Sequence, residues 1–439
     1  MGHSQETKDR IKASLNATRE RHSQMDCKVY EVKIVNDKLS RSKKETLDRF
    51  FLEAKWMKNH ILAGDIKDAT PSMKTADVKL PDGSFETREL ENLGSHMKQS
   101  ILSGIKGDLR SLKASKEKGR RVGRLKFCKE FTSIDLKEHG NTYVVDRKAK
   151  KVKIQKLGWV RVRGLDNIPE DVEFANAKLL NKPDGYYLAI TTYRDKNMSP
   201  SRQYMPGSVI GLDFGLSTAI TTSEGEHLNL YVEETDRLKR LQKKLARQTK
   251  GSNNYKKTCI LIRQEHQKMN NRKKDLAYKL VSDLSHYEHT FFQDEMISSW
   301  KKKQGYARGS KKIQKGILGR VKALLRTKDW TTMLSRGDAT TQTCVCGVKN
   351  KHQLDERTYF CGQCGYSDNR DIHAAKNMIR FGLSDKRYNT PQGLGEAPVE
   401  EVAPALHFNF LKGTASYSPV KQETYLLKSG ETHPSSVGG

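Results

Sequence analysis

Four of the seven cysteines stand in two close pairs near the C-terminal end of the sequence. The second pair is C-x-x-C followed by glycine, and the first pair, C-x-C, is one residue tighter. Four thiolates close a tetrahedral site around Zn²⁺, and such a site is structural because no position is left for a reacting water. We therefore expect one structural zinc ion, with His352 as an alternative to the first cysteine. The expected ligands are Cys344, Cys346, Cys361 and Cys364.

A carboxylate interrupts the apolar segment 209–215, VIGLDFG. On a strand, alternation places Asp213 on the face opposite Ile210, Leu212 and Phe214. A buried lone carboxylate costs several kcal/mol unless it is paired or bound to a metal. The position therefore indicates a functional acid, with an acid at a strand edge as the ordinary alternative.

A second apolar segment, 291–297, holds two adjacent acids, Asp294 and Glu295. Neighbouring side chains face opposite sides of a strand, so only one of the two can point at a site shared with Asp213. An acid pair at a simple strand end is the alternative.

A third acid, Asp371, stands where a helix is expected to begin, with Asp368 or Asn369 as its cap. Asp371 shares one helical face with Ala374 and Ala375, and these small side chains let the helix lie close to a sheet. The ordinary alternative is an acid that favours the positive end of the helix dipole.

Together the three acidic positions are more specific than any one of them. Three carboxylates on a sheet and an adjoining helix can hold two divalent ions about 4 Å apart, which position a water and stabilise the leaving oxygen of a phosphodiester. Carboxylate and water oxygens are the ligands that Mg²⁺ prefers. The pattern therefore predicts a two-metal site that hydrolyses phosphodiesters.

The charge of the chain indicates a polyanionic partner. Its 439 residues include 81 Lys and Arg against 52 Asp and Glu, for a formal net charge of +29. This balance is unusual for a metabolic enzyme and suits phosphate binding with counterion release. The segment 109–127 alone carries four Lys, four Arg and one Glu. The expected nucleic-acid contacts are Arg110, Lys113, Lys116, Lys118, Arg120, Arg121, Arg124, Lys126, Arg161 and Arg163.

The elements that must position these residues follow from hydrophobic periodicity. We expect residues 1–26 to be a loose leader or a solvated helix, and 197–207 to be a linker. The expected strands are 27–35, several within 142–192, a hairpin over 209–222 and a strand over 290–297; the expected helices are 43–62, 235–248, 255–285, 317–327 and one from about 370.

No apolar run approaches the roughly 18 residues of a membrane-spanning helix. The first residues also lack the apolar core of a secretion signal and do not fit a myristoylation motif. We therefore expect a soluble, cytoplasmic protein.

Several motifs resemble the RuvC-like nucleases of the transposon TnpB lineage, and they occur in the same order. They are LGWVRVRG, GLDFGLSTAI, the basic helices around QTKGSNNYKK, the strand ending in QDE, the TQTC and FCGQCG ribbon, and DNRDIHAAKNM. The segment FQDEMISSW resembles the miniature type V CRISPR effectors of the F subtype more than it resembles TnpB. The resemblance covers about residues 27–380. The chain departs from the family pattern at His373, at the additional Asn369 and in the short first cysteine pair.

This resemblance implies an α+β multidomain fold with an oligonucleotide-binding-like wedge barrel, an inserted helical recognition region, an RNase H-like RuvC domain and a zinc-ribbon insertion. It implies Asp213, Glu295 and Asp371 as the catalytic acids that bind two Mg²⁺ ions. The domains implied are a leader 1–26, wedge barrel 27–42 and 126–196, helical region 43–125, linker 197–207, RuvC 208–342 and 367–381, zinc ribbon 343–366 and a poorly ordered tail 382–439.

The resemblance also implies the partners: a guide RNA, a double-stranded DNA target beside a short flanking motif, and a second copy of the chain on the same guide. The candidate dimer patch is an apolar stripe, for which packing inside one monomer is the alternative use. The stripe comprises Leu47, Phe50, Ala54, Met57, Ile101 and Ile105.

The leading interpretation is a guide-RNA-directed DNA endonuclease, in which base pairing reads the sequence and the protein reads shape and a short motif. Three alternatives stay open: a TnpB nuclease guided by transposon-end RNA, a nuclease-dead RNA-guided binder, and a guide-free zinc-ribbon DNA-binding protein.

Overall fold

The computed structural model describes residues 4–388, except 65, 67–68, 81, 217, 302–312, 352 and 354–355. The expected tail from 382 therefore lies almost entirely outside the described residues, as does His352. The chain divides after Ser201 into two units, each with its own core. Among the described helices, none is long and apolar enough to cross a membrane.

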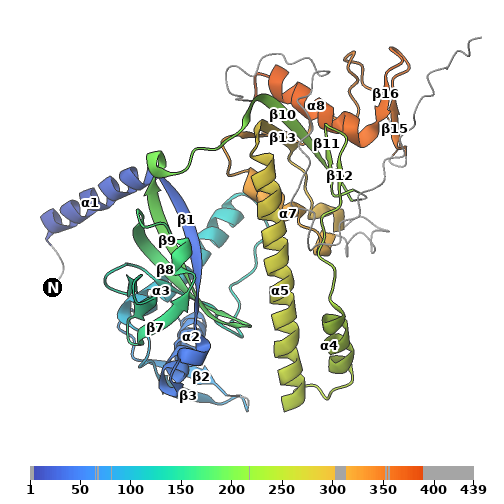
Figure 1. Cartoon of the computed structure of the whole chain (residues 1–439). Coiled ribbons are helices and arrows are strands. Elements are labelled where there is room, and N and C mark those ends of the chain that lie inside the picture. Colours follow the sequence, from blue (N-terminus) through green and yellow to red (C-terminus); the bar gives the residue numbers. More distant parts are fainter. Residues whose placement is uncertain are drawn as a thin grey trace, which may run out of the picture. The chain divides into compact units, whose positions relative to one another are not determined.

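The first unit is built on an antiparallel sheet of seven described strands, in the order β4-β8-β9-β1-β7-β6-β5 (Figure 1). Its strands are β1 (Met25–Ile34), β4 (Ser133–Leu136), β5 (Tyr143–Asp146), β6 (Lys151–Ile154), β7 (Gly158–Arg163), β8 (Glu173–Lys182) and β9 (Gly185–Asp195). Side chains alternate along β7: Val160 and Val162 are buried, whereas Arg161 and Arg163 are exposed. The strands expected between 142 and 192 and the face carrying the two arginines are confirmed.

Two helices cover one face of this sheet, α2 (Arg41–Ala63) and α3 (Ser95–Glu117). In the sequence, a hairpin of β2 (Thr75–Lys79) and β3 (Phe85–Glu89) separates the two helices. The region expected to be helical therefore also contains two strands. All six residues of the candidate dimer patch lie in the core of this unit and are at most 5% exposed. The patch was the wrong surface for a dimer, and the alternative of packing inside the monomer is confirmed.

The N-terminal segment forms helix α1 (Gln5–Ser23). Of the two forms expected for the leader, a loose segment or a solvated helix, it therefore has the helix. Most of its residues are exposed to solvent. Its last turn is held to the sheet, because Arg21 and His22 both bind the carboxylate of Glu173, and the His22 ring stacks on Tyr193 with centroids 3.7 Å apart.

The second unit contains a mixed sheet of five described strands, in the order β12-β11-β10-β13-β14. They are β10 (Met205–Phe214), β11 (Ile220–Thr222), β12 (His227–Leu228), β13 (Tyr287–Gln293) and β14 (Thr331–Leu334). Strands β10, β13 and β14 are parallel. On the other side of β10, β11 pairs with it antiparallel, and β12 pairs antiparallel with β11. The strand β14 was not expected from the sequence, and β13 ends before the two acids, which had been placed inside it.

Helices cover both faces of this sheet. Ile210, Leu212 and Phe214 point from β10 into a core shared with the end of α5 (Asn253–Leu284) and with α7 (Leu318–Leu325). The opposite face packs against α8 (Arg370–Ser384). The contact is close because β10 has a glycine there: a Cβ on Gly211 would lie 1.9 Å from the carbonyl oxygen of Ala375. The small face expected on this helix is confirmed.

Two smaller parts extend from the second unit. The helix α4 (Asp236–Ala246) packs against α5 to form a helical hairpin, and both expected basic helices are confirmed (Figure 1). The strands β15 (Thr358–Phe360) and β16 (Ser367–Asn369) form a two-stranded ribbon that leads directly into α8.

The close approach of α8 to β10 generates a stability prediction. In Gly211→Ala the new methyl group meets backbone, which cannot rotate away, so we expect a loss of at least about 1–3 kcal/mol in the free energy of unfolding of the second unit. Urea denaturation of the full chain measures it. Gly337→Ala is the control, because its Cβ would meet only an ordinary contact at 3.9 Å and should change stability by less than about 0.5 kcal/mol. Equal stability of the two variants would contradict the contact.

Candidate functional site

Asp213 lies next to the end of β10, on the face that packs against α8. It alternates with Leu212 and Phe214, which point into the core on the other face, and it follows Gly211 by two residues. The side chain is half-buried. The expectation that Asp213 projects opposite the apolar side chains of its strand is confirmed.

Asp294 and Glu295 follow the end of β13, the strand beside β10. The two have different surroundings. The Asp294 carboxylate binds Lys322 and Arg336, and these cations hold the pKa of Asp294 below its ordinary value, with the Lys322 hydrogen bond as the largest cause. The charge of Glu295, in contrast, acts on Asp213. Of the two neighbours, Glu295 is therefore the acid that shares an environment with Asp213.

Asp371 lies in the first turn of α8. The helix begins there because the Asn369 side chain accepts hydrogen bonds from the backbone N–H groups of Asp371 (2.9 Å) and Ile372 (3.3 Å). The additional asparagine thus serves as the helix cap. Arg357 and Arg370 lie 3.7 Å and 3.6 Å from the Asp371 carboxylate.

Asp213 feels the charges of both other acids, Glu295 and Asp371. Burial raises the pKa of Asp213 well above its ordinary value, and the charges of Asp371 and Glu295 raise it further, against a smaller opposite effect of Arg370. Like charges in a partly dehydrated place disfavour ionisation unless a cation compensates them. The effect of these charges on Asp213 brings the three acids into one electrostatic environment, whereas the described residues whose ligand atoms lie within 4.8 Å of one another are the four cysteines.

A pocket of about 410 Å³ is lined in part by residues that follow Asp213 and Glu295 in the sequence. Gly215 and Leu216, just after Asp213, form part of its wall, and so does Ile297, two residues after Glu295. Tyr231 and Arg320 add an aromatic ring and a cation to the lining. These lining residues are sequence neighbours of the two sheet acids, and the acids themselves are not part of the wall.

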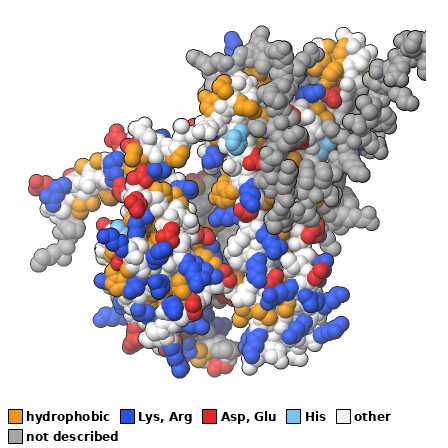
Figure 2. Space-filling view, viewed as in Figure 1, with side chains coloured by type: hydrophobic (Ala, Val, Ile, Leu, Met, Phe, Trp, Pro, Cys, Tyr) orange, Lys and Arg blue, Asp and Glu red, His pale blue; other side chains and the backbone are white. Residues whose placement is uncertain are grey.

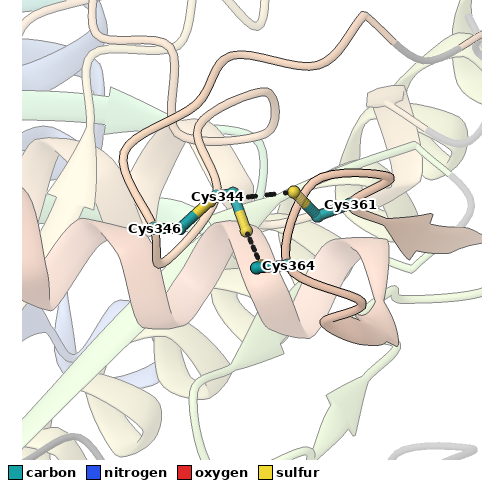
Figure 3. A group of neighbouring side chains, drawn as sticks. All are labelled: Cys344, Cys346, Cys361 and Cys364. Atoms are coloured by element: carbon teal, nitrogen blue, oxygen red, sulfur yellow. Dashed lines mark hydrogen bonds between the residues drawn. The ribbon is translucent and has the colours of Figure 1, made fainter.

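The four clustered cysteines point toward one another from two loops (Figure 3). Their sulfur atoms all lie within 4.8 Å of one another, and two Sγ–Sγ distances, Cys344–Cys364 and Cys346–Cys361, are 3.4 and 3.7 Å. Zinc–sulfur bonds of about 2.3 Å place tetrahedral ligands roughly 3.8 Å apart. Backbone N–H groups of Cys364 and Gln363 lower the pKa of Cys361 to about 6, whereas neighbouring cysteines raise the pKa of Cys364, so the thiols do not ionise equally without a metal. The residues fit Zn²⁺ as a set of four, including the tight first pair.

The ribbon is attached to α8 through His373, one of the three features that depart from the pattern of the nucleases that the sequence resembles. The buried His373 ring stacks on Tyr359 of β15, with centroids 3.7 Å apart, and its Nε2 lies 3.0 Å from the Thr343 carbonyl oxygen. Asn377 donates to the carbonyl oxygens of Thr343 and Thr340, and Arg380 donates to that of Cys344. One face of α8 therefore carries the cysteine ribbon, and its first turn carries Asp371.

All ten basic residues predicted to contact nucleic acid are exposed in the first unit. Eight of them follow the second half of α3 and the irregular segment after it, and Arg161 and Arg163 stand on β7. Within the part of the chain that the structure describes, none of the ten forms an ion pair with a carboxylate. Among the described residues, no carboxylate neutralises their charge.

Two groups of residues were not named among the predicted site residues. One is a set of exposed cations at the end of the α4–α5 hairpin, where Lys and Arg side chains gather (Figure 2). This set comprises Arg240, Lys243, Lys244, Arg247, Lys250, Lys256 and Lys257. The sequence marked these helices as basic without naming the residues as contacts, and 240–257 contains no acid. The other is the pair Lys322 and Arg336, which only the tertiary structure brings to Asp294.

Two family models match separate segments of the chain. The OrfB_IS605 family, described as "Probable transposase", matches residues 191–291. The "Cas12f1-like, TNB domain" matches residues 329–378. The first match includes β10 and Asp213, and the second includes the four cysteines and Asp371.

Two relatives are similar over part of their length. "Putative RNA-guided DNA endonuclease InsQ" of Escherichia coli is 25% identical over 54% of this chain and 63% of its own. A "Putative RNA-guided DNA endonuclease" of Streptomyces pristinaespiralis is 28% identical over 40% of this chain and 46% of its own. The chain thus spans less than two thirds of either relative.

Two solved structures are also similar. One is a Cas12f1 with sgRNA and target DNA, with a TM-score of 0.37 and 13% identity over 65% of this chain and 71% of that one. The other is a CRISPR-Cas12f ternary complex, with a TM-score of 0.26 and 12% identity over 80% and 81%. With one sequence family matching its central strands and another its ribbon and α8, the chain resembles the miniature TnpB- and Cas12f-like nucleases.

Proposed function

We propose that this protein is a guide-RNA-directed DNA endonuclease whose catalytic acids are Asp213, Glu295 and Asp371. The observation that carries the proposal is that the charges of Glu295 and Asp371 act on Asp213, with the three acids positioned by two neighbouring parallel strands and the first turn of α8. Such a cluster is costly in a free protein and is suited to divalent metal ions.

The three acids would hold two Mg²⁺ ions, which supply a positioned water and a stabilised leaving oxygen when they are bound. The residues of the chain orient the carboxylates that receive them. Asn369 caps α8 and fixes the turn that carries Asp371, and Gly211 lets that turn reach β10. In this proposal the second unit, without its ribbon, is an RNase H-like RuvC domain.

The nucleic-acid partners are proposed from charge and from the relatives. Both similar curated proteins are named as RNA-guided DNA endonucleases. The exposed cations along α3 and β7 offer a surface for phosphates, and a contact of this kind reads shape and not sequence. We propose that the first unit, with its sheet as the wedge barrel, binds the guide RNA and the double-stranded DNA beside a short flanking motif.

One preparation of the purified protein distinguishes this function from its alternatives. RNA that copurifies with the protein is sequenced: a CRISPR repeat favours the F-subtype effectors, and a transposon end favours a TnpB nuclease. A guide-free DNA-binding protein would carry no RNA and would not need one to bind a specific site. The nuclease-dead binder is disfavoured, because all three acids are present.

The acids generate the first functional prediction. Asp213→Asn, Glu295→Gln and Asp371→Asn should each reduce cleavage of a guide-matched DNA to background, because each removes a metal ligand. Binding of guide and target should persist, because the loss of negative charge near phosphates does not weaken it. Cleavage and gel-shift assays on the same preparation measure both.

Asp275→Asn is the matched control, because this acid lies on α5 with its side chain 64% exposed and forms an ion pair with Lys279 on the same helix. It should cleave as the parent does. Wild-type cleavage by any of the three acid variants would remove that residue from the site.

We also propose that Cys344, Cys346, Cys361 and Cys364 bind one structural Zn²⁺. Cys361→Ser should lower zinc content from about one ion per chain and destabilise the ribbon and α8, because the folding of a closed thiolate site is tied to its metal. Elemental analysis and thermal unfolding measure the two effects. Cys128→Ser and Cys259→Ser, at isolated half-buried cysteines, should keep the zinc. Protein purified without chelators and found free of zinc would refute the site.

The last proposal concerns stoichiometry. A single chain of this size covers only part of a heteroduplex of about 20 base pairs, which favours two chains on one guide RNA. The contact must use a surface other than the apolar stripe of α2 and α3, because that stripe is core. Light scattering on the guide-bound complex should give a 2:1 protein-to-guide mass. One protein copy per active guide would exclude the homodimer and favour the TnpB alternative.

A further inference from the structure

The two acidic residues that follow β13 are unusually well fixed for a segment outside any strand. Asp294 N–H donates to the Leu334 carbonyl at 3.0 Å, and Glu295 N–H donates to that of Gln293 at 2.8 Å. The Asp294 carbonyl accepts from Arg336 Nε at 2.9 Å, and the Glu295 carbonyl accepts from Lys322 Nζ at 2.7 Å. All four backbone polar groups of this dipeptide are therefore bonded.

The side chain of Asp294 is the centre of this arrangement. One carboxylate oxygen accepts from Lys322 Nζ, and the other accepts from Arg336 Nη2 at 3.0 Å. These are the same two cations that hold the backbone carbonyls of Asp294 and Glu295. Lys322 comes from α7 and is only 15% exposed, whereas Arg336 follows β14. The carboxylate thus keeps both cations where they fix the backbone.

We infer that Asp294 is a positioning residue, which with Lys322 and Arg336 sets the direction of the Glu295 side chain toward Asp213. The inference rests on the proposed function, because it takes Glu295 as a metal ligand. A ligand on a loosened backbone loses the geometry that its metal requires, and functional groups must be held within about 0.5 Å. Partners of metal ligands typically contribute 10–100-fold to metal affinity.

Two other roles for Asp294 make different predictions. As a metal ligand itself, Asp294 would act independently of Lys322. As a source of negative charge near the metal, Asp294 would strengthen metal binding by electrostatics alone, and Lys322 would weaken it. In the positioning role, removal of either partner weakens metal binding, although the two changes alter the local charge in opposite directions.

The experiment is a Mn²⁺ titration of the full chain, in which free Mn²⁺ is followed by its electron paramagnetic resonance signal. We expect Asp294→Ala and Lys322→Met each to weaken Mn²⁺ binding about 10–100-fold, and the double variant to be no weaker than the singles. Asp294→Asn keeps one acceptor oxygen and should lie between Asp294→Ala and the parent. Higher Mg²⁺ concentration should partly restore cleavage in these variants.

Thermal unfolding accompanies each titration, and the mild Asp294→Asn variant keeps the test valid if Asp294→Ala does not fold. Glu233→Gln is the matched control, because it breaks the Glu233–Lys315 ion pair of 2.6 Å in the same unit and should leave Mn²⁺ affinity unchanged. Tighter Mn²⁺ binding in Lys322→Met, or unchanged affinity in both Asp294 variants, would overturn the positioning role.

Glu295→Gln separates this inference from the function on which it rests. If Glu295→Gln leaves Mn²⁺ affinity intact, the assignment of Glu295 as a ligand is wrong, and the inference falls with it. If Glu295→Gln weakens binding and the Asp294 variants do not, only the positioning role of Asp294 is overturned.

Discussion

The close contact between Gly211 of β10 and the backbone of Ala375 in α8 is the constraint on which the candidate site depends. A side chain at position 211 would move the helix outward, and with it the first turn that carries Asp371. The same helix holds the cysteine ribbon through His373, Asn377 and Arg380. One backbone approach therefore determines where an acid of the sheet, an acid of the helix and the ribbon stand relative to one another.

This arrangement has an electrostatic cost, because it gathers negative charge in a place that water reaches poorly. The raised pKa of Asp213 expresses that cost. The adjacent acids Asp294 and Glu295 have different surroundings. Lys322 and Arg336 bind the carboxylate of Asp294 and neutralise its charge, whereas the charge of Glu295 acts on Asp213. Adjacent residues of the same chemical type thus acquire different roles from their neighbours in space.

Much of this could be predicted from the sequence. The apolar alternation around Asp213 indicated which face the acid occupies, and the small residues after Asp371 indicated a helix close to a sheet; both are confirmed. The spacing of the four cysteines predicted their cluster. The apolar stripe on α2 was harder, since periodicity shows that a face is buried but not whether a partner chain or the chain's own sheet covers it. The stripe belongs to the core of the first unit.

By itself, the sequence determined the residue types that do chemistry and the local elements that carry them, because periodicity, capping and cysteine spacing are short-range properties. The family resemblance pointed to Glu295, but only the tertiary structure gave a physical difference from Asp294, since the cations that bind Asp294 lie 28 and 42 residues further along the chain. Of the two caps that the sequence allowed for α8, the structure has Asn369, and only the tertiary structure showed that His373 stacks on the ribbon. These relations depend on which surfaces meet after folding, and no local pattern encodes such a meeting.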